Sequence, residues 1–184
     1  INLNKYKLEA SAPELEQKNG SRKPIVTRNA IIISMILIGI LLAAHFFAFG
    51  YQNERIAFGQ FVLVLVSLIV TQLEVRDKLY QGILPFDKAF GTAMMVVLMV
   101  TAIFSFFTLI FYLTIGTDVL AEMRTIAENS LREQGKTEED IASRMTFTNR
   151  ILTPVGMFFM SLVGNMFFGT IAALIASLFT QRRA

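Results

Sequence analysis

The chain contains no cysteine and only one histidine, His45. The lack of cysteine excludes disulfides, thiolate nucleophiles and cysteine-ligated zinc or iron–sulfur centres. One histidine cannot complete a haem or metal site within the chain, so we interpret His45 as a hydrogen-bonding residue at a helix contact or at the membrane interface. The sequence also lacks a nucleophile–base constellation, a phosphate-binding loop and metal-ligand spacing. It predicts a protein that is not an enzyme and that uses no cofactor and no metal.

Charge is scarce and unevenly placed along the chain. Asp, Glu, Lys and Arg make up 17% of the 184 residues, against 54% hydrophobic residues. Uncharged runs of 25, 18, 29 and 31 residues follow Arg28, Arg55, Lys88 and Arg150, and about 20 apolar residues are needed to cross a bilayer core as a helix. The sequence therefore predicts an all-α, polytopic membrane protein whose four transmembrane helices form two hairpins, with spans at about residues 31–50, 56–73, 90–115 and 155–179.

The placement of these charges disfavours two classes of protein. None of the four long runs carries a charged residue, whereas coupled transporters and pumps usually place one inside the membrane to move ions or protons. The net charge of +3 does not indicate nucleic-acid binding, because Lys and Arg are not gathered into a stripe with interleaved aromatic residues. We expect membrane lipids as partners, and no nucleic acid.

Basic residues near the ends of the spans indicate the orientation of the chain. Those that would share one side are Arg22, Lys23, Arg28, Arg76, Lys78, Lys88, Arg182 and Arg183. The other side has Arg55 and residues 117–153, where seven acidic residues outnumber five basic ones. By the positive-inside rule both termini are cytoplasmic, residues 1–29 form a polar cytoplasmic tail, and residues 30–184 form the membrane domain. Arg76, Lys78 and Lys88 then act as a topology anchor.

The anchor belongs to the stretch from Glu74 to Gly91, the strongly charged break between the two hairpins. Glu74 precedes Lys78 by four residues, which is the better order for a helical ion pair, so the second helix is expected to run a turn beyond its span. Gly82 can end that helix. Pro85 and Asp87 suit the first turn of the next one.

Residues 117–153 form the one long connection between spans, and they predict an extracytoplasmic helical hairpin at about 118–150. Gly135 separates its two helices, and Thr137 with Asp140 is typical of the start of the second. The apolar edges of the two helices are Leu120, Met123, Ala127, Leu131, Ile141 and Met145. Such a hairpin fits either the membrane surface or the surface of a partner.

Small residues recur at four-residue intervals in two of the spans, which is typical of close helix packing in lipid. The first span carries Gly39 and Ala43. The fourth span begins at a Thr153 cap followed by Pro154. Its stripe, the strongest packing pattern in the chain, consists of Ser161, Asn165, Gly169, Ala173 and Ser177.

Polar residues line one face of the second and third spans. In the second span they are Gln60, Ser67, Thr71 and Glu74. In the third span they are Thr101, Ser105, Thr108 and Tyr112. Each set shares a helical face and is expected to face protein. The face on the third span fits either helix packing, with hydroxyls bonded to the preceding turn, or a polar conduit.

The motifs around the central stretch resemble those of a known family. The matching residues are Arg76-Asp77-Lys78, Gly82, Phe86, Lys88-Ala89-Phe90 and Gly91, followed by a long span, an acidic loop with LREQGKTEEDIASRM and a span that begins at Pro154. Over roughly residues 28–183 this order and spacing resembles the uncharacterised membrane family known as domain of unknown function 4199. The resemblance implies a four-helix protein of the bacterial inner membrane with no established activity.

Two functions remain open at the level of sequence. The first is a non-catalytic accessory or structural subunit of a larger bacterial inner-membrane complex, which packs with other membrane-protein subunits through small-residue stripes. The second is a small homo-oligomeric channel or carrier that uses the polar faces of the second and third helices. The stripe on the fourth span favours the first function, and the aligned polar faces favour the second.

Overall fold

The computed structural model describes residues 20–47 and 54–182, which form six helices and no strand. The end expected for the first span, most of the N-terminal tail and Arg183 lie outside the described residues. The helices are α2 (Lys23–Phe46), α3 (Glu54–Leu79), α4 (Phe86–Thr114), α5 (Thr117–Glu133), α6 (Glu138–Ile151) and α7 (Pro154–Thr180). Four of them, α2, α3, α4 and α7, are long and apolar enough to cross a membrane. The predicted all-α architecture with four membrane-spanning helices is thus confirmed.

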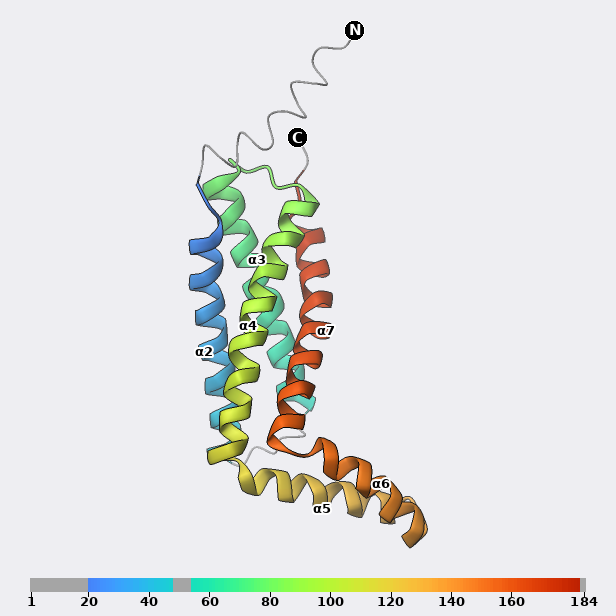
Figure 1. Cartoon of the computed structure of the whole chain (residues 1–184). Helices are drawn as coiled ribbons and strands as arrows, with labels where there is room; N and C mark the ends of the chain where they lie inside the picture. The colour runs from blue at the N-terminus through green and yellow to red at the C-terminus, as the bar shows by residue number, and fades with distance from the viewer. Residues whose placement is uncertain (1–19, 48–53, 183–184) are drawn as a thin grey trace.

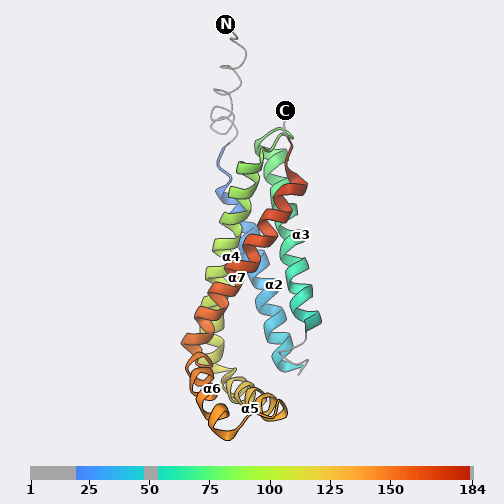
Figure 2. The same cartoon turned by 90° about the vertical axis from the view of Figure 1, so that its right-hand side faces the viewer.

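The four long helices run side by side as a bundle, and α5 and α6 lie across one end of it (Figure 1). We call the α5–α6 hairpin the helical arm and the end that carries it the arm end. The start of α2, the end of α7 and the α3–α4 connection meet at the opposite end, which we call the connection end (Figures 1 and 2). Figure 2 also shows α3 and α7 diverging toward the arm end.

The first described helix begins earlier than the sequence suggested. Helix α2 begins at Lys23 rather than near residue 31, so residues 23–29 belong to the first helix and not to the tail. Pro24 does not break this helix because it lies in the first turn, where a backbone N–H has no intrahelical partner to lose. Helix α4 begins at Phe86, directly after Pro85, as Pro85 and Asp87 suggested, although its apolar span was expected only from about residue 90.

Other boundaries agree with the sequence expectations. Helix α3 continues to Leu79, and Gly82 follows with φ +89°, donating its N–H to the carbonyl oxygen of Arg76 at 3.1 Å. Only glycine adopts such a φ at no steric cost. At the start of α7 the Thr153 hydroxyl accepts the N–H of Gly156 at 3.0 Å, as expected for a capping residue.

The main core lies where α4 packs against α2 and α7, with Leu68 of α3 inside it. Its members are mostly alanine and β-branched residues: Val26, Ala30, Ile33, Leu37, Leu68, Ala93, Val96, Val97, Val100, Ala172, Ala173 and Ala176. A second cluster around Val75, Leu84 and Ala89 closes the connection end. A third around Phe111, Tyr112, Val119 and Leu120 joins the bundle to the helical arm. Small core side chains let the helix backbones approach closely.

Candidate functional site

A buried glutamine joins three helices near the connection end. Gln72 of α3 is fully buried, and its Nε2 donates to the carbonyl oxygen of Ala89 at 3.0 Å and to Ser177 Oγ at 2.8 Å. Its Oε1 accepts the hydroxyl of Thr180 at 2.8 Å. These hydrogen bonds hold α3, α4 and α7 together, and we call Gln72, Ala89, Ser177 and Thr180 the clasp.

Sequence reasoning missed Gln72, although it singled out its neighbours Thr71 and Glu74. The available signal was the amide itself, because a polar side chain inside an apolar membrane helix has to find a partner within the protein. The helical face formed by Gln60, Ser67, Thr71 and Glu74 does not include Gln72, which lies one position beyond Thr71.

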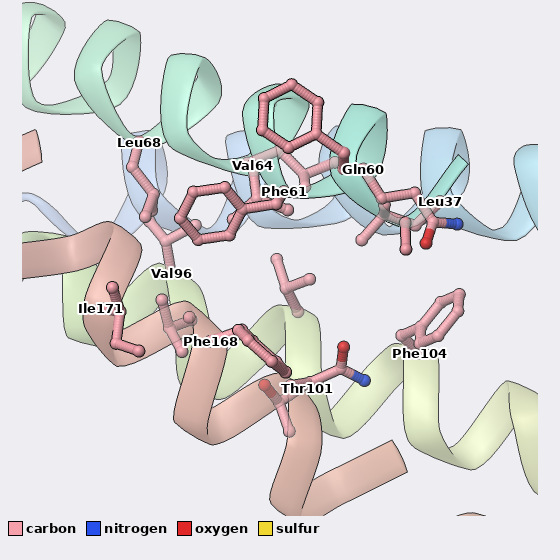
Figure 3. Close-up of a pocket in the computed structure, with 17 residues that line it drawn as sticks. Leu37, Gln60, Phe61, Val64, Leu68, Val96, Thr101, Phe104, Phe168 and Ile171 are labelled. Atoms are coloured by element: carbon pink, nitrogen blue, oxygen red, sulfur yellow. The ribbon is translucent and has the colours of Figure 1, made fainter. Parts of the chain in front are cut away.

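Next to the clasp, toward the arm end, the helices line a partly open cavity of about 580 Å³. Such a volume is in the range of small-molecule sites. Side chains from all four long helices line it, and those of α3 point across it toward α4 and α7 (Figure 3). The lining is apolar apart from Gln60, Thr101 and Asn165, and its apolar residues include Leu37, Val64, Leu68, Val96, Phe104, Phe168 and Ile171. We call this space the bundle cavity.

The polar groups of the bundle cavity differ in their hydrogen bonding. Asn165 donates to Ser161 Oγ at 2.9 Å, and the hydroxyls of Ser161 and Ser105 lie 3.1 Å apart. Thr101 is only 3% exposed. Among residues 20–47 and 54–182, neither the Thr101 hydroxyl nor the Gln60 amide has a side-chain hydrogen bond. The cavity therefore holds polar groups with unused hydrogen-bonding capacity in an apolar wall.

The predicted stripe on α7 faces the neighbouring helices along its whole length. Gly169 is packed so tightly that a Cβ there would lie 2.6 Å from Val97 Cγ1. Ala173 and Ser177 are completely buried, and Ser161 and Asn165 take part in the hydrogen bonds described above. These five residues belong to the contact surface of α7 within this chain, which also includes Ala172, Ala176 and Thr180.

The second predicted small-residue pair has no such role inside the bundle. Gly39 is exposed, and a Cβ added to it would meet no atom within 4 Å, while Ala43 is half-buried. The physical reason is that α2 turns the face with Val26, Ile33 and Leu37 toward the core and leaves Gly39 outside. Packing at Gly39 stays a prediction only for a contact with another chain.

The polar face predicted on α4 is buried. Thr101, Ser105, Thr108 and Tyr112 all lie inside the protein. Ser105 meets Ser161 of α7, and the Thr108 hydroxyl donates to the carbonyl oxygen of Phe104 in its own helix at 2.9 Å. Only Thr101 lines the bundle cavity. Most of this face is therefore occupied by helix packing in a single chain.

The polar line of α3 divides between two neighbours. Gln60 lines the bundle cavity, whereas Thr71 and Glu74 face α2. Asn29 donates to Thr71 Oγ1 at 3.1 Å and to Glu74 Oε2 at 3.2 Å, and Arg28 donates to the same carboxylate oxygen at 2.5 Å. The sequence reasoning did not pair α2 with α3 through Asn29, because no spacing rule relates residues of different helices.

The predicted topology anchor lies at the connection end. Lys78 pairs with Glu74 at 2.7 Å, as the i to i+4 spacing predicted, and Arg76 pairs with Asp77 at 2.8 Å. The carbonyl oxygen of Lys88 accepts a hydrogen bond from Arg22 at 3.4 Å. The three anchor residues thus each contact a residue at the connection end, but which side of the membrane they occupy stays a prediction.

Changing Arg76, Lys78 and Lys88 together to Glu is expected to disturb or invert the insertion of α4 and α7, because Lys and Arg next to a span favour the cytoplasmic side. A topology reporter fused after α4 measures this. The matched control changes Lys136, Arg144 and Arg150 of the helical arm to Glu and should leave the reporter where it is. A reporter that stays in place in the anchor variant contradicts the anchor interpretation.

His45 of α2 lies against α4. The His45 ring lies edge-on to Phe111, with 5.3 Å between the ring centroids.

In the helical arm, Arg132 donates to Glu128 at 2.9 Å and also pairs with Glu138, and these hydrogen bonds raise the pKa of Arg132. Arg124 donates to the carbonyl oxygen of Leu152 at 2.5 Å. Polar contacts thus tie the two arm helices together at both the tip and the base.

In the described part of the chain, six helices, four of them able to span a bilayer and lining a largely apolar cavity, define a polytopic α-helical membrane protein. The chain belongs to the family described as protein of unknown function (DUF4199), whose model matches residues 28–182. This confirms the resemblance seen around the central stretch. No curated protein and no solved structure matches the chain.

Proposed function

We propose that the protein is a non-catalytic accessory or structural subunit of a larger complex in the bacterial inner membrane, with both termini in the cytoplasm. The observation that carries this proposal is the helical arm. It projects beyond the bundle on the side of α7 (Figure 1). Of its residues, only Val119 and Leu120 of α5 and Ile141 of α6 are buried. The arm therefore adds little to the core of the chain itself.

The arm is nevertheless held in a defined position. Val119 and Leu120 pack on Phe111 and Tyr112 of α4, and the Arg124 hydrogen bond to Leu152 joins α5 to the end of α6, directly before α7. A well-anchored element with mostly unused surface is suited to bind a partner with little loss of conformational freedom. Phe147, which is 67% exposed, is the large apolar side chain on α6 that a partner could cover.

The test is purification of the full chain from native membranes in a mild detergent, with native mass spectrometry to detect stoichiometric partners. The Phe147→Asp variant is expected to lose about tenfold or more of a co-purifying subunit, since exposed aromatic anchors often dominate an interface. Asn149→Asp adds the same charge to another face of α6 and should retain the subunit.

Two results would count against the subunit proposal. One is recovery of isolated monomers only, from native membranes that contain the unmodified chain. The other is ion flux in liposomes that is lost when Thr101 and Ser105 are both changed to Leu, which would support the homo-oligomeric channel or carrier instead. Because Ser105 bonds to Ser161 and faces α7, a water path along this face requires α4 and α7 to separate.

A further inference from the structure

An arginine that pairs with no described carboxylate lies between α2 and α4 at the connection end. Arg22 directly precedes α2, and its Nη1 donates to the carbonyl oxygen of Lys88 at 3.4 Å and to Thr92 Oγ1 at 3.3 Å. Both acceptors are uncharged. Within the described ranges Arg22 makes no ion pair, and its Nε and Nη2 donate no hydrogen bond. The guanidinium therefore keeps its charge and most of its donors for a ligand.

Helix α4 holds this guanidinium in a defined place. A Cβ added to Gly91 would lie 3.6 Å from Nη1 and 3.9 Å from Nη2 of Arg22, so the guanidinium lies against α4 where that helix has no side chain. Thr92, which accepts a hydrogen bond from Arg22, is completely buried, and Arg22 itself is half-buried. Arg22 is thus a bridge between two helices and not a freely moving surface side chain.

Positive charge is in excess where α2 and α4 begin. Other basic residues of the connection end are paired with carboxylates, in the pairs Arg28–Glu74, Lys78–Glu74 and Arg76–Asp77. The first turn of α2 contains no acidic residue, and Lys23 adds a second cation there. In the first turn of α4, Asp87 makes no ion pair with Arg22, and Lys88 follows it. An anion bound beside Arg22 would reduce this excess.

Arg22 and Lys88 lie at the level of the lipid head groups. Arg22 directly precedes α2 and Lys88 is the third residue of α4, and both helices are long and apolar enough to cross a membrane. Basic side chains at the ends of such helices lie among the head groups. Lys88, Gly91 and Thr92 are three and four residues apart, so they share the face of α4 on which the Arg22 guanidinium lies.

From these cations toward the arm end, apolar side chains border the contact between α2 and α4. Met99 follows Lys88 by eleven residues, close to three helical turns, and so shares its face of α4. The Met99 sulfur lies 3.9 Å from Thr27 Oγ1 of α2. Ile31, one turn after Thr27, and Leu98, next to Met99, are 49% and 53% exposed. We call this surface the α2–α4 seam, which consists of Arg22, Thr27, Ile31, Lys88, Leu98 and Met99.

We propose that the α2–α4 seam binds an anionic phospholipid of the leaflet at the connection end. The lipid phosphate accepts hydrogen bonds from Nε and Nη2 of Arg22, and Lys88 adds positive charge. One acyl chain lies along the apolar part of the seam. The phosphate oxygens give Arg22 the counter-charge that no described carboxylate supplies. The excess of positive charge repels the quaternary ammonium of phosphatidylcholine and so favours a lipid with net negative charge.

The experiment is native mass spectrometry of the full chain in detergent, titrated with phosphatidylglycerol or with phosphatidylcholine of the same acyl chains. Phosphatidylglycerol is expected to fill one saturable site at an about tenfold lower concentration, since each cation near a head group contributes roughly fivefold. Equal binding of the two lipids identifies ordinary surrounding lipid and overturns the proposal. Displacement of phosphatidylglycerol by inorganic phosphate at an equal concentration also overturns it, because the site then takes a free anion.

Two substitutions each remove one positive charge from the connection end. Arg22→Gln should weaken the binding of phosphatidylglycerol about fivefold, and Arg22→Lys, which keeps the charge, should retain more binding than Arg22→Gln. Arg76→Gln is the matched control and should leave binding unchanged, because Arg76 is already paired with Asp77. An equal loss in Arg22→Gln and Arg76→Gln means that net charge alone attracts the lipid, and it overturns the proposed site.

A second pair of variants supplies the carboxylate from within the chain. Gly91→Glu places an acidic side chain beside Arg22, since a Cβ there would lie 3.6 Å from Nη1, and it should abolish the preference for phosphatidylglycerol over phosphatidylcholine. Gly91→Gln has nearly the same size without the charge and should retain the preference. With both variants folded by circular dichroism, loss of the preference in both or in neither overturns the assignment of Arg22 as the phosphate ligand.

Discussion

Replacing Gly169 with alanine is expected to destabilise the protein by about 1–3 kcal/mol, the usual range for overpacking a filled core. The added Cβ would lie 2.6 Å from Val97 Cγ1 and 3.3 Å from Cγ2. Val97 is buried and β-branched, so its side chain has little freedom to turn away. Thermal unfolding of the purified chain, followed by helical circular dichroism, measures the loss.

Gly164 provides the matched control on the same helix. A Cβ at Gly164 would meet no atom within 4 Å, so Gly164→Ala should be neutral or slightly stabilising, since alanine is the better helix former. The double variant Gly169→Ala with Val97→Ala should recover part of the loss, because the clashing γ-carbons are gone. Equal unfolding temperatures for the Gly164 and Gly169 variants would show that α4 and α7 are not in close contact there.

Changing Gln72 to Glu is expected to have the largest effect in the clasp, a loss of about 3 kcal/mol or more. The change removes the Nε2 donor to Ala89 and Ser177 and places a carboxylate beside the Ala89 carbonyl oxygen in a fully buried position. An uncompensated buried charge costs far more than a lost hydrogen bond. Gln72→Leu should cost about 1–2 kcal/mol, as for hydrogen bonds of roughly 0.6 kcal/mol each within a membrane protein.

The unfolding temperatures of these variants should fall in the order Leu above Glu, and both below the unmodified chain. Gln60→Leu on the same helix is the control, since the Gln60 amide has no side-chain hydrogen bond among the described residues. It should be neutral or stabilising. A Gln72→Leu variant as stable as the unmodified chain would mean that the clasp contributes no net stability.

The positions of the spans could be predicted because a helix needs a long uncharged run to cross the membrane, whereas the start of α2 could not. Pro85 and Thr153-Pro154 were expected at helix starts and lie there, but residues 23–29 were expected in the polar tail and belong to α2, with Pro24 in its first turn. The spacing of small residues was equally ambiguous. Gly39 and Gly169 both begin a small-residue pair four apart, but only Gly169 meets a neighbour. The spacing shows which residues share a face of one helix, but the position of a neighbouring helix decides whether that face makes a contact.

The bundle cavity and the clasp were beyond sequence reasoning for a related reason. Both depend on how α3 lies relative to α7, which are close at Gln72 and farther apart toward the arm end (Figure 2). The divergence of two helices depends on both of them, so it produces no periodic pattern in the sequence of either helix. The polar residues Gln60, Thr101 and Asn165 were visible in the sequence, but only the packing of the helices shows that all three line one cavity.

The clasp also sets an order of events during synthesis of the chain. Gln72 enters the membrane 105 residues before its partner Ser177, which at ribosomal rates corresponds to a delay of roughly 5–20 s. During that interval Ala89 is the one clasp partner of Gln72 already made, and the hydroxyls of α4 that later face α7 border lipid or other chains. The nascent three-helix intermediate is therefore the state in which a membrane chaperone or a quality-control protease would find polar groups exposed. Insertion of α7 ends that exposure.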